Sequence, residues 1–204
     1  MVYLIVAALA YLIGTSSMAL YLSKMQKVNL RAGGSGNLGA SNTVQLMGWR
    51  AGVLVAVHDI GKSVLAVLLA QLMFPGLPYI GAVAGVSSVL GHIFPFYLKF
   101  RGGKGLASYF GMVLALNWKL ALIAAAVIIL ATLITDFISV GAMSTIVVVP
   151  AYTAFVEHSL ILAAILCVAT VVMFYKHWEN IVRIANHQEI GLRSSARGER
   201  RIDK

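Results

Sequence analysis

The feature that most constrains the fold of this chain is a series of long apolar stretches that covers most of its length. Of its 204 residues 60% are hydrophobic and 11% are charged, with a mean hydropathy of +0.88. Soluble domains carry about a quarter charged residues, and a helix that crosses a bilayer needs about 20 apolar residues. We therefore expect an all-α, polytopic membrane helix bundle with spans near residues 2–23, 51–74, 79–98, 106–117, 119–134, 138–156 and 159–176.

The number of spans depends on whether the short fourth and fifth stretches form two helices or one. Lys and Arg concentrate in cytoplasmic loops. With seven spans and the N-terminus outside, nearly every Lys and Arg lies inside, with Lys119 outside and Lys62 within a span. Six spans would put the tail, which begins at Lys176, on the opposite side. We therefore expect seven transmembrane helices, an outside N-terminus and a cytoplasmic C-terminus.

The chain is expected to form one transmembrane domain over residues 1–192, followed by a basic cytoplasmic tail over residues 193–204. The tail has many charges and no apolar face, a composition typical of disorder. The first stretch lacks a basic leader and a cleavage site, so we interpret it as a mature transmembrane helix. The net charge of +9 indicates loops that attract anionic lipid, and no nucleic-acid partner is expected. Cys167 stands alone, which excludes a disulfide framework or a thiolate metal site.

A glycine-rich segment at residues 33–43 reads Gly-Gly-Ser-Gly-Asn-Leu-Gly-Ala-Ser-Asn-Thr. Glycines let the backbone approach a ligand closely, and N–H groups turned inward bind phosphate oxygens. A flexible connector is the simpler interpretation, but a linker rarely mixes asparagines so regularly with glycines beside a helix start. We therefore predict a phosphate-binding loop whose candidate ligands are Gly34, Ser35, Gly36, Asn37, Gly39 and Asn42.

A second polar segment follows the third apolar stretch and reads Gly-His-Ile-Phe-Pro, then Phe-Arg-Gly-Gly-Lys-Gly, at residues 91–95 and 100–105. Gly102 and Gly103 free the backbone before Lys104, and the helix start just after it adds partial positive charge, which predicts an anion site. Arg101 is as readily a membrane anchor as a ligand. His92 lies within the span and is either a hydrogen-bonded interior histidine or a ligand.

A third polar segment begins at His177 and ends near Glu189. At 3.6 residues per turn, His177, Asn180 and Arg183 share one helix face, while Glu179 points to the opposite side. That face can donate several hydrogen bonds to one phosphorylated ligand. Taken alone, it is better explained as the polar end of a membrane helix, but beside two other phosphate-type segments we interpret it as a binding face.

Two further pairs of polar residues lie between these segments. Asp59 and Lys62 stand three residues apart within a span, where charges are costly, and a structural ion pair is the preferred interpretation. Asp136 and Ser139 fall in a turn expected on the cytoplasmic side, where Ser139 is a candidate ligand and Asp136 a candidate helix cap.

Together, Gly-Ser-Gly-Asn-x-Gly-Ala-x-Asn at 34–42, Gly-His-x-Phe-Pro through Gly-Gly-Lys-Gly at 91–105 and His-x-x-Asn-Ile-x-Arg at 177–183 resemble the PlsY family of bacterial acyl-phosphate:glycerol-3-phosphate acyltransferases. The resemblance runs from the first span to about Glu189. It implies an inner-membrane enzyme, with its active site on the cytoplasmic side, that transfers a fatty acyl group from acyl phosphate to the 1-hydroxyl of sn-glycerol 3-phosphate. The products would be lysophosphatidic acid and phosphate, in phospholipid biosynthesis.

Three positions depart from the family pattern. Where the family usually has Arg a few residues after the first motif, this chain has Gln45, and Arg50 is the expected substitute contact. The Lys-Gly pair of the second span is replaced by Lys62-Ser63, and a glycine two residues before the final Glu is replaced by His187. The last two changes affect local backbone rather than charge.

The chemistry implied by this resemblance needs few catalytic groups. An acyl phosphate is already activated, so positioning and oxyanion donors suffice, and no covalent nucleophile is expected. The His-x4-Asp pair of other acyltransferases is absent. We expect Ser35 and Asn37 with loop amides to hold the acyl phosphate, and Lys104, His177, Asn180 and Arg183 to hold glycerol 3-phosphate. The base is either His177 or a substrate phosphate oxygen.

The expected site therefore has three catalytic residues and a wider binding set, with no metal and no cofactor. The partners implied are the two substrates, membrane lipid and a peripheral enzyme that forms acyl phosphate. The catalytic residues are Ser35, His177 and Lys104, and the binding residues are Gly34, Gly36, Asn37, Gly39, Asn42, Arg50, His92, Arg101, Gly102, Gly103, Ser139, Asn180, Arg183 and Glu189.

Other classes of membrane protein fit less well. A phosphate-ester transporter would show paired repeats and polar residues near the midplane, whereas these three clusters are expected on one side. A lipid-phosphate phosphatase would need paired histidines. A CDP-alcohol transferase would need clustered aspartates, but Asp59, Asp136 and Asp203 are scattered.

Overall fold

The computed structural model describes residues 1–193, and every regular element in that part of the chain is helical. The all-α expectation is therefore confirmed for these residues. Of the tail expected at residues 193–204, only Arg193 lies within the described part. The elements are α1 (Val2–Thr15), α2 (Met18–Met25), α3 (Ala40–Met47), α4 (Trp49–Met73), α5 (Ile80–Ile93), the 3₁₀ turn η1 (Phe96–Leu98), α6 (Leu106–Leu116), α7 (Trp118–Thr135), α8 (Ile138–Phe155) and α9 (Leu160–Ala185).

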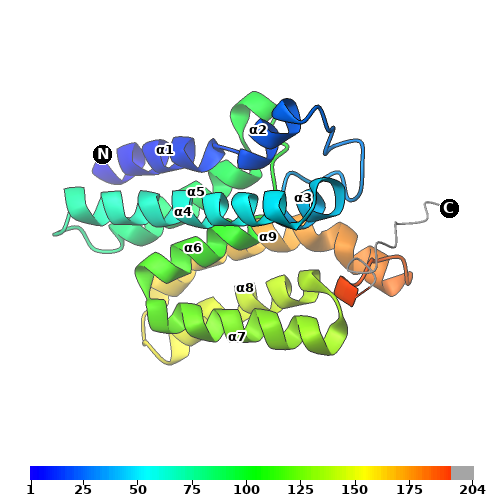
Figure 1. Cartoon of the computed structure of the whole chain (residues 1–204). Coiled ribbons are helices and arrows are strands. Elements are labelled where there is room, and N and C mark those ends of the chain that lie inside the picture. The colour runs from blue at the N-terminus through cyan, green and yellow to red at the C-terminus, as the bar shows by residue number, and fades with distance from the viewer. Residues whose placement is uncertain (194–204) are drawn as a thin grey trace.

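The long helices form two groups that the short helix α6 joins (Figure 1). α1, α4 and α5 contact one another, and α8 packs between α7 and α9. α6 contacts α4 and α5 in the first group and α7 in the second, and its Tyr109, Met112 and Val113 are buried in the main hydrophobic core. Gly111 permits close packing, because a Cβ there would lie 2.3 Å from the carbonyl oxygen of Ile60. α6 therefore connects the two groups, which also contact each other through α5 and α9.

Six described helical segments are long and apolar enough to cross a membrane. α6 is apolar but has only 11 residues, about 16 Å at 1.5 Å per residue, against a hydrocarbon core of about 30 Å. Six segments therefore reach the length of a full span, whereas the stretch expected as the fourth span forms the shorter helix α6, so the expectation of seven spans is not confirmed. The six are Val2–Met25, Trp49–Met73, Ile80–Leu98, Trp118–Thr135, Ile138–Phe155 and Leu160–Ala185.

The alternative of one long helix across the fourth and fifth stretches is wrong. Asn117 has extended backbone angles (φ −153°, ψ 101°) and separates α6 from α7. Its side chain accepts hydrogen bonds from the backbone N–H groups of Lys119 and Leu120, which caps the start of α7. Asparagine at this position therefore ends one helix and begins the next.

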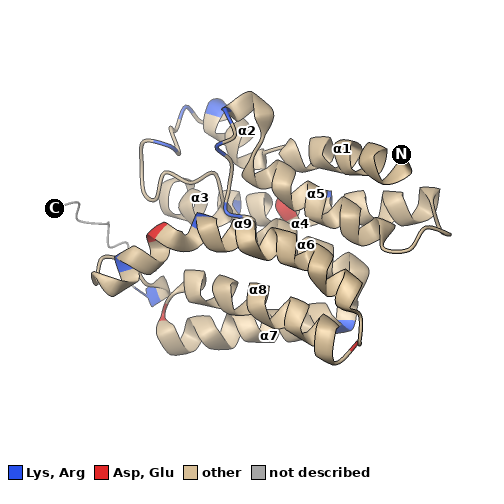
Figure 2. Ribbon diagram, turned by 180° about the vertical axis from the view of Figure 1, so that it is seen from behind, with Lys and Arg blue, Asp and Glu red and all other residues tan. Residues whose placement is uncertain are grey.

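The two ends of the bundle differ in charge. α1 begins at one end and α9 finishes at the other (Figure 1). In Figure 2 the blue segments of Lys and Arg gather toward the end where α2 and α3 lie. Lys119 stands at the opposite end, in the first turn of α7, and Lys62 lies inside the bundle. The charge asymmetry that the sequence predicted is therefore present along the bundle axis.

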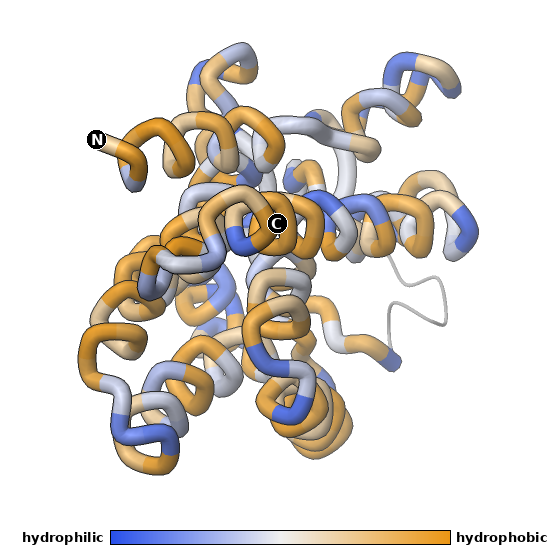
Figure 3. Tube along the Cα trace, turned by 90° about the vertical axis from the view of Figure 1, so that its left-hand side faces the viewer, coloured by the Kyte–Doolittle hydropathy of each residue, from blue (hydrophilic) through white to orange (hydrophobic). Residues whose placement is uncertain are grey.

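The first apolar stretch is broken rather than continuous. α1 stops at Thr15, and Ser17 begins α2 by accepting a hydrogen bond from the N–H of Leu20 at 3.2 Å. The carbonyl oxygen of Ser16, freed by this break, accepts a hydrogen bond from the ammonium of Lys62 at 2.8 Å. Figure 3 shows hydrophobic colour along most helical turns and hydrophilic colour in short segments.

Candidate active site

A cavity of about 540 Å³ lies between the two groups of helices, within the range of roughly 300–1,000 Å³ typical of small-molecule sites. Its wall includes the glycine-rich loop with α3, parts of α4 and α6 to α8, the residues just before α6, and α9 with the segment that follows it. All three motifs found in the sequence therefore meet at one cavity.

The glycine-rich loop is held in shape by Asn42. The Oδ1 of Asn42 accepts a hydrogen bond from the N–H of Ser35 at 2.9 Å, and its Nδ2 donates to the carbonyl oxygens of Leu30 and Asn37 at 2.8 and 2.9 Å. Both amide protons of Asn42 are thereby used by the loop itself. Gly34 has φ +56°, and a Cβ there would lie 2.2 Å from Oδ1 of Asn42, so no larger residue fits. Asn42 thus shapes the loop and leaves Ser35 facing the cavity.

Two helices begin at the cavity wall, each after a glycine. α3 follows Gly39 and α6 follows Gly105, and neither glycine offers a side chain to cap the helix. The residues on either side of each helix start line the cavity. The first N–H groups of a helix lack partners within it, and the helix dipole adds partial positive charge, so such ends bind anions. Two anion-binding helix ends therefore converge on one space.

Lys104 enters the cavity from the segment before α6, and its ammonium donates a hydrogen bond to Oδ1 of Asn180. Burial, followed by the positive charge of Arg183, lowers the pKa of Lys104 to about 8. A buried ammonium beside a second cation is unfavourable, and Glu189, which pairs with Arg183, offsets only part of this effect because the pKa of Lys104 stays lowered. The pair therefore favours a phosphate ligand.

The helix face that the sequence predicted for His177, Asn180 and Arg183 is present on α9 and lines the cavity. The side chain of Glu179, by contrast, is 82% exposed. Nδ1 of His177 lies 2.8 Å from the carbonyl oxygen of Met173. Because a carbonyl oxygen only accepts, Nδ1 carries the proton, and a neutral ring keeps a lone pair on Nε2.

Glu189 holds the ligands of α9 in place from the segment after the helix. Its Oε1 accepts a hydrogen bond from Nδ2 of Asn180 and its Oε2 accepts one from Nε of Arg183, both at 2.5 Å. Charge-assisted bonds of this kind are about twice as strong as neutral ones. Glu189 therefore orients an amide and a cation rather than offering a ligand of its own to an anionic substrate.

Ser139 lies in the first turn of α8 and also lines the cavity. Its Oγ is buried and has no hydrogen-bond partner among the described residues. An unpaired buried hydroxyl is costly, so a ligand atom here would be stabilising. Asp136, a candidate helix cap, is the C-terminal cap of α7, in the left-handed region, and it also accepts hydrogen bonds from the N–H groups of Leu192 and Arg193.

Part of the cavity wall is apolar. It is formed by α4 side chains such as Val53 and Ile60, by Phe110 of α6, by Ile128 of α7 and by Ala142 of α8. The polar motifs form other parts of the wall. The cavity can therefore hold a molecule with an anionic head and an apolar chain.

Two predicted cationic ligands are not among the residues that line this cavity. Arg50 is exposed, and its guanidinium lies 5.7 Å from the ring centroid of Trp49. It therefore does not supply the contact that Gln45 lacks. Arg101 is also exposed, and its carbonyl oxygen accepts a hydrogen bond from Arg31.

Three predicted glycine ligands shape the backbone instead. The N–H of Gly36 donates to the carbonyl oxygen of Gly33 at 3.0 Å. The N–H groups of Gly102 and Gly103 donate to the carbonyl oxygens of Ile93 and His92 at 2.9 and 3.1 Å. These groups are thus used within the protein. One loop is hydrogen-bonded within itself and the other to the end of α5, and the residue pattern alone does not reveal either contact.

Several residues of the cavity wall were not predicted. Gln188, Ile190, Gly191 and Leu192 follow α9 and close one side of the cavity. They carry no periodic or compositional signal. Among these four, the structure explains only why position 191 is a glycine: a Cβ there would lie 1.9 Å from Oδ2 of Asp136.

The three departures from the expected pattern each have a structural counterpart. Gln45 lines the cavity, so a neutral amide stands where a cation was expected. The hydroxyl of Ser63 is buried and lies 3.0 Å from the hydroxyl of Ser88. His187 has φ +54°, a conformation that glycine adopts freely and that costs other residues about 1–2 kcal/mol.

The fold and the cavity together indicate a class of membrane protein that binds a phosphorylated ligand with an apolar chain. A membrane helix bundle with a cavity lined by cationic, polar and apolar side chains is suited to a phosphorylated amphiphile.

The chain belongs to the glycerol-3-phosphate acyltransferase family, whose model matches residues 4–187. It is 38% identical over 182 residues to a glycerol-3-phosphate acyltransferase of Bacillus subtilis, with 89% of this chain and 93% of that protein covered. It is 35% identical over 187 residues to one of Lactiplantibacillus plantarum, with 91% and 90% covered.

Two solved structures have the same fold. Both are of PlsY (YgiH), an integral membrane glycerol 3-phosphate acyltransferase. The glycerol 3-phosphate form matches with a TM-score of 0.87 and 29% identity over 94% of this chain and 96% of that chain. The lysophosphatidic acid form matches with a TM-score of 0.86 and 27% identity over 96% and 99%. The family expected from the three motifs is therefore confirmed.

Proposed function

We propose that this enzyme transfers a fatty acyl group from acyl phosphate to the 1-hydroxyl of sn-glycerol 3-phosphate, giving lysophosphatidic acid and phosphate. The observation that carries the proposal is that the three polar motifs and a set of apolar side chains line the same cavity. Acyl phosphate and lysophosphatidic acid each carry a phosphate and an acyl chain, and glycerol 3-phosphate carries a phosphate and the hydroxyl that receives the chain. The reaction therefore needs a polar and an apolar part of the cavity at the same time.

The phosphate of glycerol 3-phosphate is assigned to Lys104, Asn180 and Arg183. Their side chains are linked by hydrogen bonds to one another or to Glu189, which holds them in one arrangement before substrate binds. Preorganised donors of this kind lose little entropy on binding. Ser139, with its unpartnered hydroxyl, is assigned to the same ligand.

The acyl phosphate is assigned to the glycine-rich loop and the start of α3. Ser35, Asn37 and the first N–H groups of α3 line this part of the cavity. The acyl chain then lies against the apolar part of the wall, which includes Ile60 and Phe110. This places the carbonyl oxygen of the donor near hydrogen-bond donors, where negative charge develops during transfer.

The reaction is a direct transfer. The glycerol 1-hydroxyl oxygen attacks the acyl carbonyl carbon, and the bond from that carbon to the phosphate oxygen breaks, with its electron pair leaving on phosphate. The hydroxyl proton goes to Nε2 of His177 or to a phosphate oxygen of the substrate. Holding two substrates in line contributes roughly 7–11 kcal/mol and one oxyanion donor about 3 kcal/mol, enough for an activated donor.

We expect the purified enzyme to form lysophosphatidic acid from glycerol 3-phosphate with acyl phosphate and not with acyl-CoA. Activity should persist in EDTA, because residues 1–193 bring together no group of three His, Cys, Asp or Glu side chains suited to a metal. The measurement is product formation by mass spectrometry with each donor. Activity with acyl-CoA alone, or activity lost in EDTA and restored by magnesium, would contradict the proposal.

The orientation proposed is an outside N-terminus with the cavity mouth and the C-terminus on the cytoplasmic side of the inner membrane, where α6 completes the seventh, partial pass. It is supported by the gathering of Lys and Arg toward the end with α2 and α3. In that setting acyl phosphate could be delivered from a peripheral enzyme that forms it, and the product released into the bilayer.

Cysteine labelling tests this orientation. In a Cys167→Ala background, Gly76→Cys in the exposed turn after α4 should react with a membrane-impermeant maleimide in intact spheroplasts, because Gly76 lies at the end opposite to α2. Lys24→Cys, exposed at the end of α2, should react only after permeabilisation. The reverse pattern would invert the proposed topology.

A further inference from the structure

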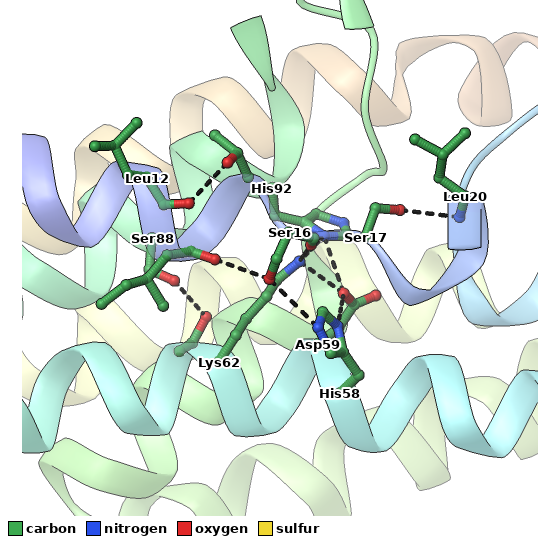
Figure 4. A network of polar contacts seen from close by, with 12 residues as sticks. Leu12, Ser16, Ser17, Leu20, His58, Asp59, Lys62, Ser88 and His92 are labelled. Atoms are coloured by element: carbon green, nitrogen blue, oxygen red, sulfur yellow. Dashed lines mark hydrogen bonds and ion pairs between the residues drawn. The ribbon is translucent and has the colours of Figure 1, made fainter. Parts of the chain in front are cut away.

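A buried charged cluster lies beside the cavity, between α1, α4 and α5 (Figure 4). Asp59, Lys62 and His92 are 3%, 5% and 8% exposed. The expected ion pair is confirmed, with Nζ of Lys62 at 2.7 Å from Oδ1 of Asp59. His92 joins the pair from α5, which the sequence did not predict, and Asp59 and His92 both line the cavity.

The hydrogen bonds of Lys62 determine the protonation of His92. The ammonium has three protons and donates them to Oδ1 of Asp59, to the carbonyl oxygen of Ser16 and to Nδ1 of His92, at 2.7, 2.8 and 2.9 Å. An ammonium cannot accept a hydrogen bond, so Nδ1 of His92 must be the acceptor. A neutral His92 then carries its proton on Nε2.

The Nε2 edge of His92 lies against the turn that leads to Lys104. A Cβ on Gly103 would lie 2.1 Å from Nε2, so the ring and the glycine fit without space for a side chain. The same turn is attached to the end of α5 by the N–H groups of Gly102 and Gly103. The position of Lys104 is therefore set by His92 through both its backbone and its ring.

We propose that Lys62 is a positioning residue of the glycerol 3-phosphate site: it locks His92 in the tautomer with the proton on Nε2, and His92 in turn presents that N–H and Lys104 to the substrate phosphate. Asp59 supplies the counter-charge that keeps Lys62 protonated inside the bundle, and the break between α1 and α2 supplies the third acceptor. Intramembrane charges are costly, which favours a functional reason for retaining all three.

A different result is expected if the ion pair only stabilises the fold. Its removal would then reduce the amount of folded enzyme without changing how the folded fraction binds substrate. A positioning role changes substrate affinity in the folded fraction. The proposal rests on the proposed function for its kinetic readout but not for its spectroscopic one, so the two can fail separately.

The kinetic test uses Lys62→Met, with Asp59→Asn/Lys62→Met as a second variant that leaves no unpaired charge in the core. In both, the KM for glycerol 3-phosphate should rise by about tenfold or more, the loss of one hydrogen bond to a charged group. The KM for the acyl donor should stay within about twofold, because that substrate binds the other loop. Ser63→Ala, which removes a buried hydrogen bond to Ser88 that involves neither Lys62 nor His92, is the matched control and should keep both values.

The spectroscopic test reads the tautomer itself. In [15N]histidine-labelled protein, His92, assigned with a His92→Gln variant, should show an unprotonated Nδ1 and a protonated Nε2. In Lys62→Met, Nδ1 faces only the carboxylate of Asp59, 3.4 Å away, and should become protonated. A protonated Nδ1 in the unsubstituted enzyme, or an unchanged KM for glycerol 3-phosphate in both variants, would overturn the proposal.

Discussion

Replacing Lys104 with glutamine should lower kcat/KM for glycerol 3-phosphate by about a hundredfold or more. A hydrogen bond to a charged group contributes about 1.5–3 kcal/mol to binding, and more when it strengthens in the transition state. Glutamine can still donate to Asn180, so the loss reports the charge and not the packing. Steady-state kinetics with saturating acyl donor measure the effect.

We also expect the KM for glycerol 3-phosphate to depend on pH through Lys104. Phosphate binds the protonated ammonium, and the pKa of Lys104 in the empty site is about 8. As the pH rises above this value, the charged fraction falls and the KM for glycerol 3-phosphate should rise, by up to about tenfold per pH unit. Lys104→Arg should move this rise beyond the accessible pH range, since arginine stays protonated. In Lys104→Gln the KM should be flat across the same range.

Lys99→Gln is the matched control for Lys104. Lys99 lies on the same connection between α5 and α6 but is exposed, and it is not part of the cavity wall. This variant should retain the activity of the unsubstituted enzyme. Equal losses in the two variants would show that the loop needs positive charge in general, as a membrane anchor does, and would remove Lys104 from the site.

Replacing Ser35 with alanine should lower kcat by roughly ten- to a thousandfold, the range for losing one oxyanion donor. Ser35 lies between two glycines with positive φ and faces the cavity, while its backbone N–H is held by Asn42. The loop therefore positions the hydroxyl, which can donate a hydrogen bond to the acyl phosphate. Ser35→Thr keeps the hydroxyl and should retain most of the activity, whereas an unchanged kcat in Ser35→Ala would remove this role.

No acyl group should accumulate on Ser35. A serine nucleophile needs an adjacent base, and the hydrogen bonds of the described residues place no histidine on Ser35. An acyl phosphate is already activated, so a covalent step adds little. Rapid quench of enzyme with acyl phosphate in the absence of glycerol 3-phosphate, followed by mass spectrometry, should show unmodified enzyme. Stoichiometric acylation of Ser35 would contradict direct transfer.

Much of the site follows from short-range pattern. The shared face of His177, Asn180 and Arg183 comes from helical spacing alone, and the pairing of Asp59 with Lys62 comes from a separation of one helical turn. Apolar length likewise predicted most of the helices, because the bilayer sets the length that a spanning helix needs. These are properties of a segment and do not depend on its neighbours.

Contacts between distant segments could not be predicted in this way. The sequence suggested Arg50 as a ligand, yet the start of α4 turns it toward Trp49, and it suggested the N–H groups of Gly102 and Gly103, which α5 uses. It gave no sign that Glu189 would hold Asn180. Each outcome depends on which helix ends meet after packing.

What the sequence by itself determined is the class of fold, the family and the three motifs, since each is written in local spacing and composition. Only the tertiary structure decided that α6 begins at the cavity wall, and that Lys62 reaches both the end of α1 and His92. The physical reason is that a buried charge or an unpaired helix end must find its partner in space. That partner lies on whichever helix packs beside it, at a distance along the chain that no local pattern records.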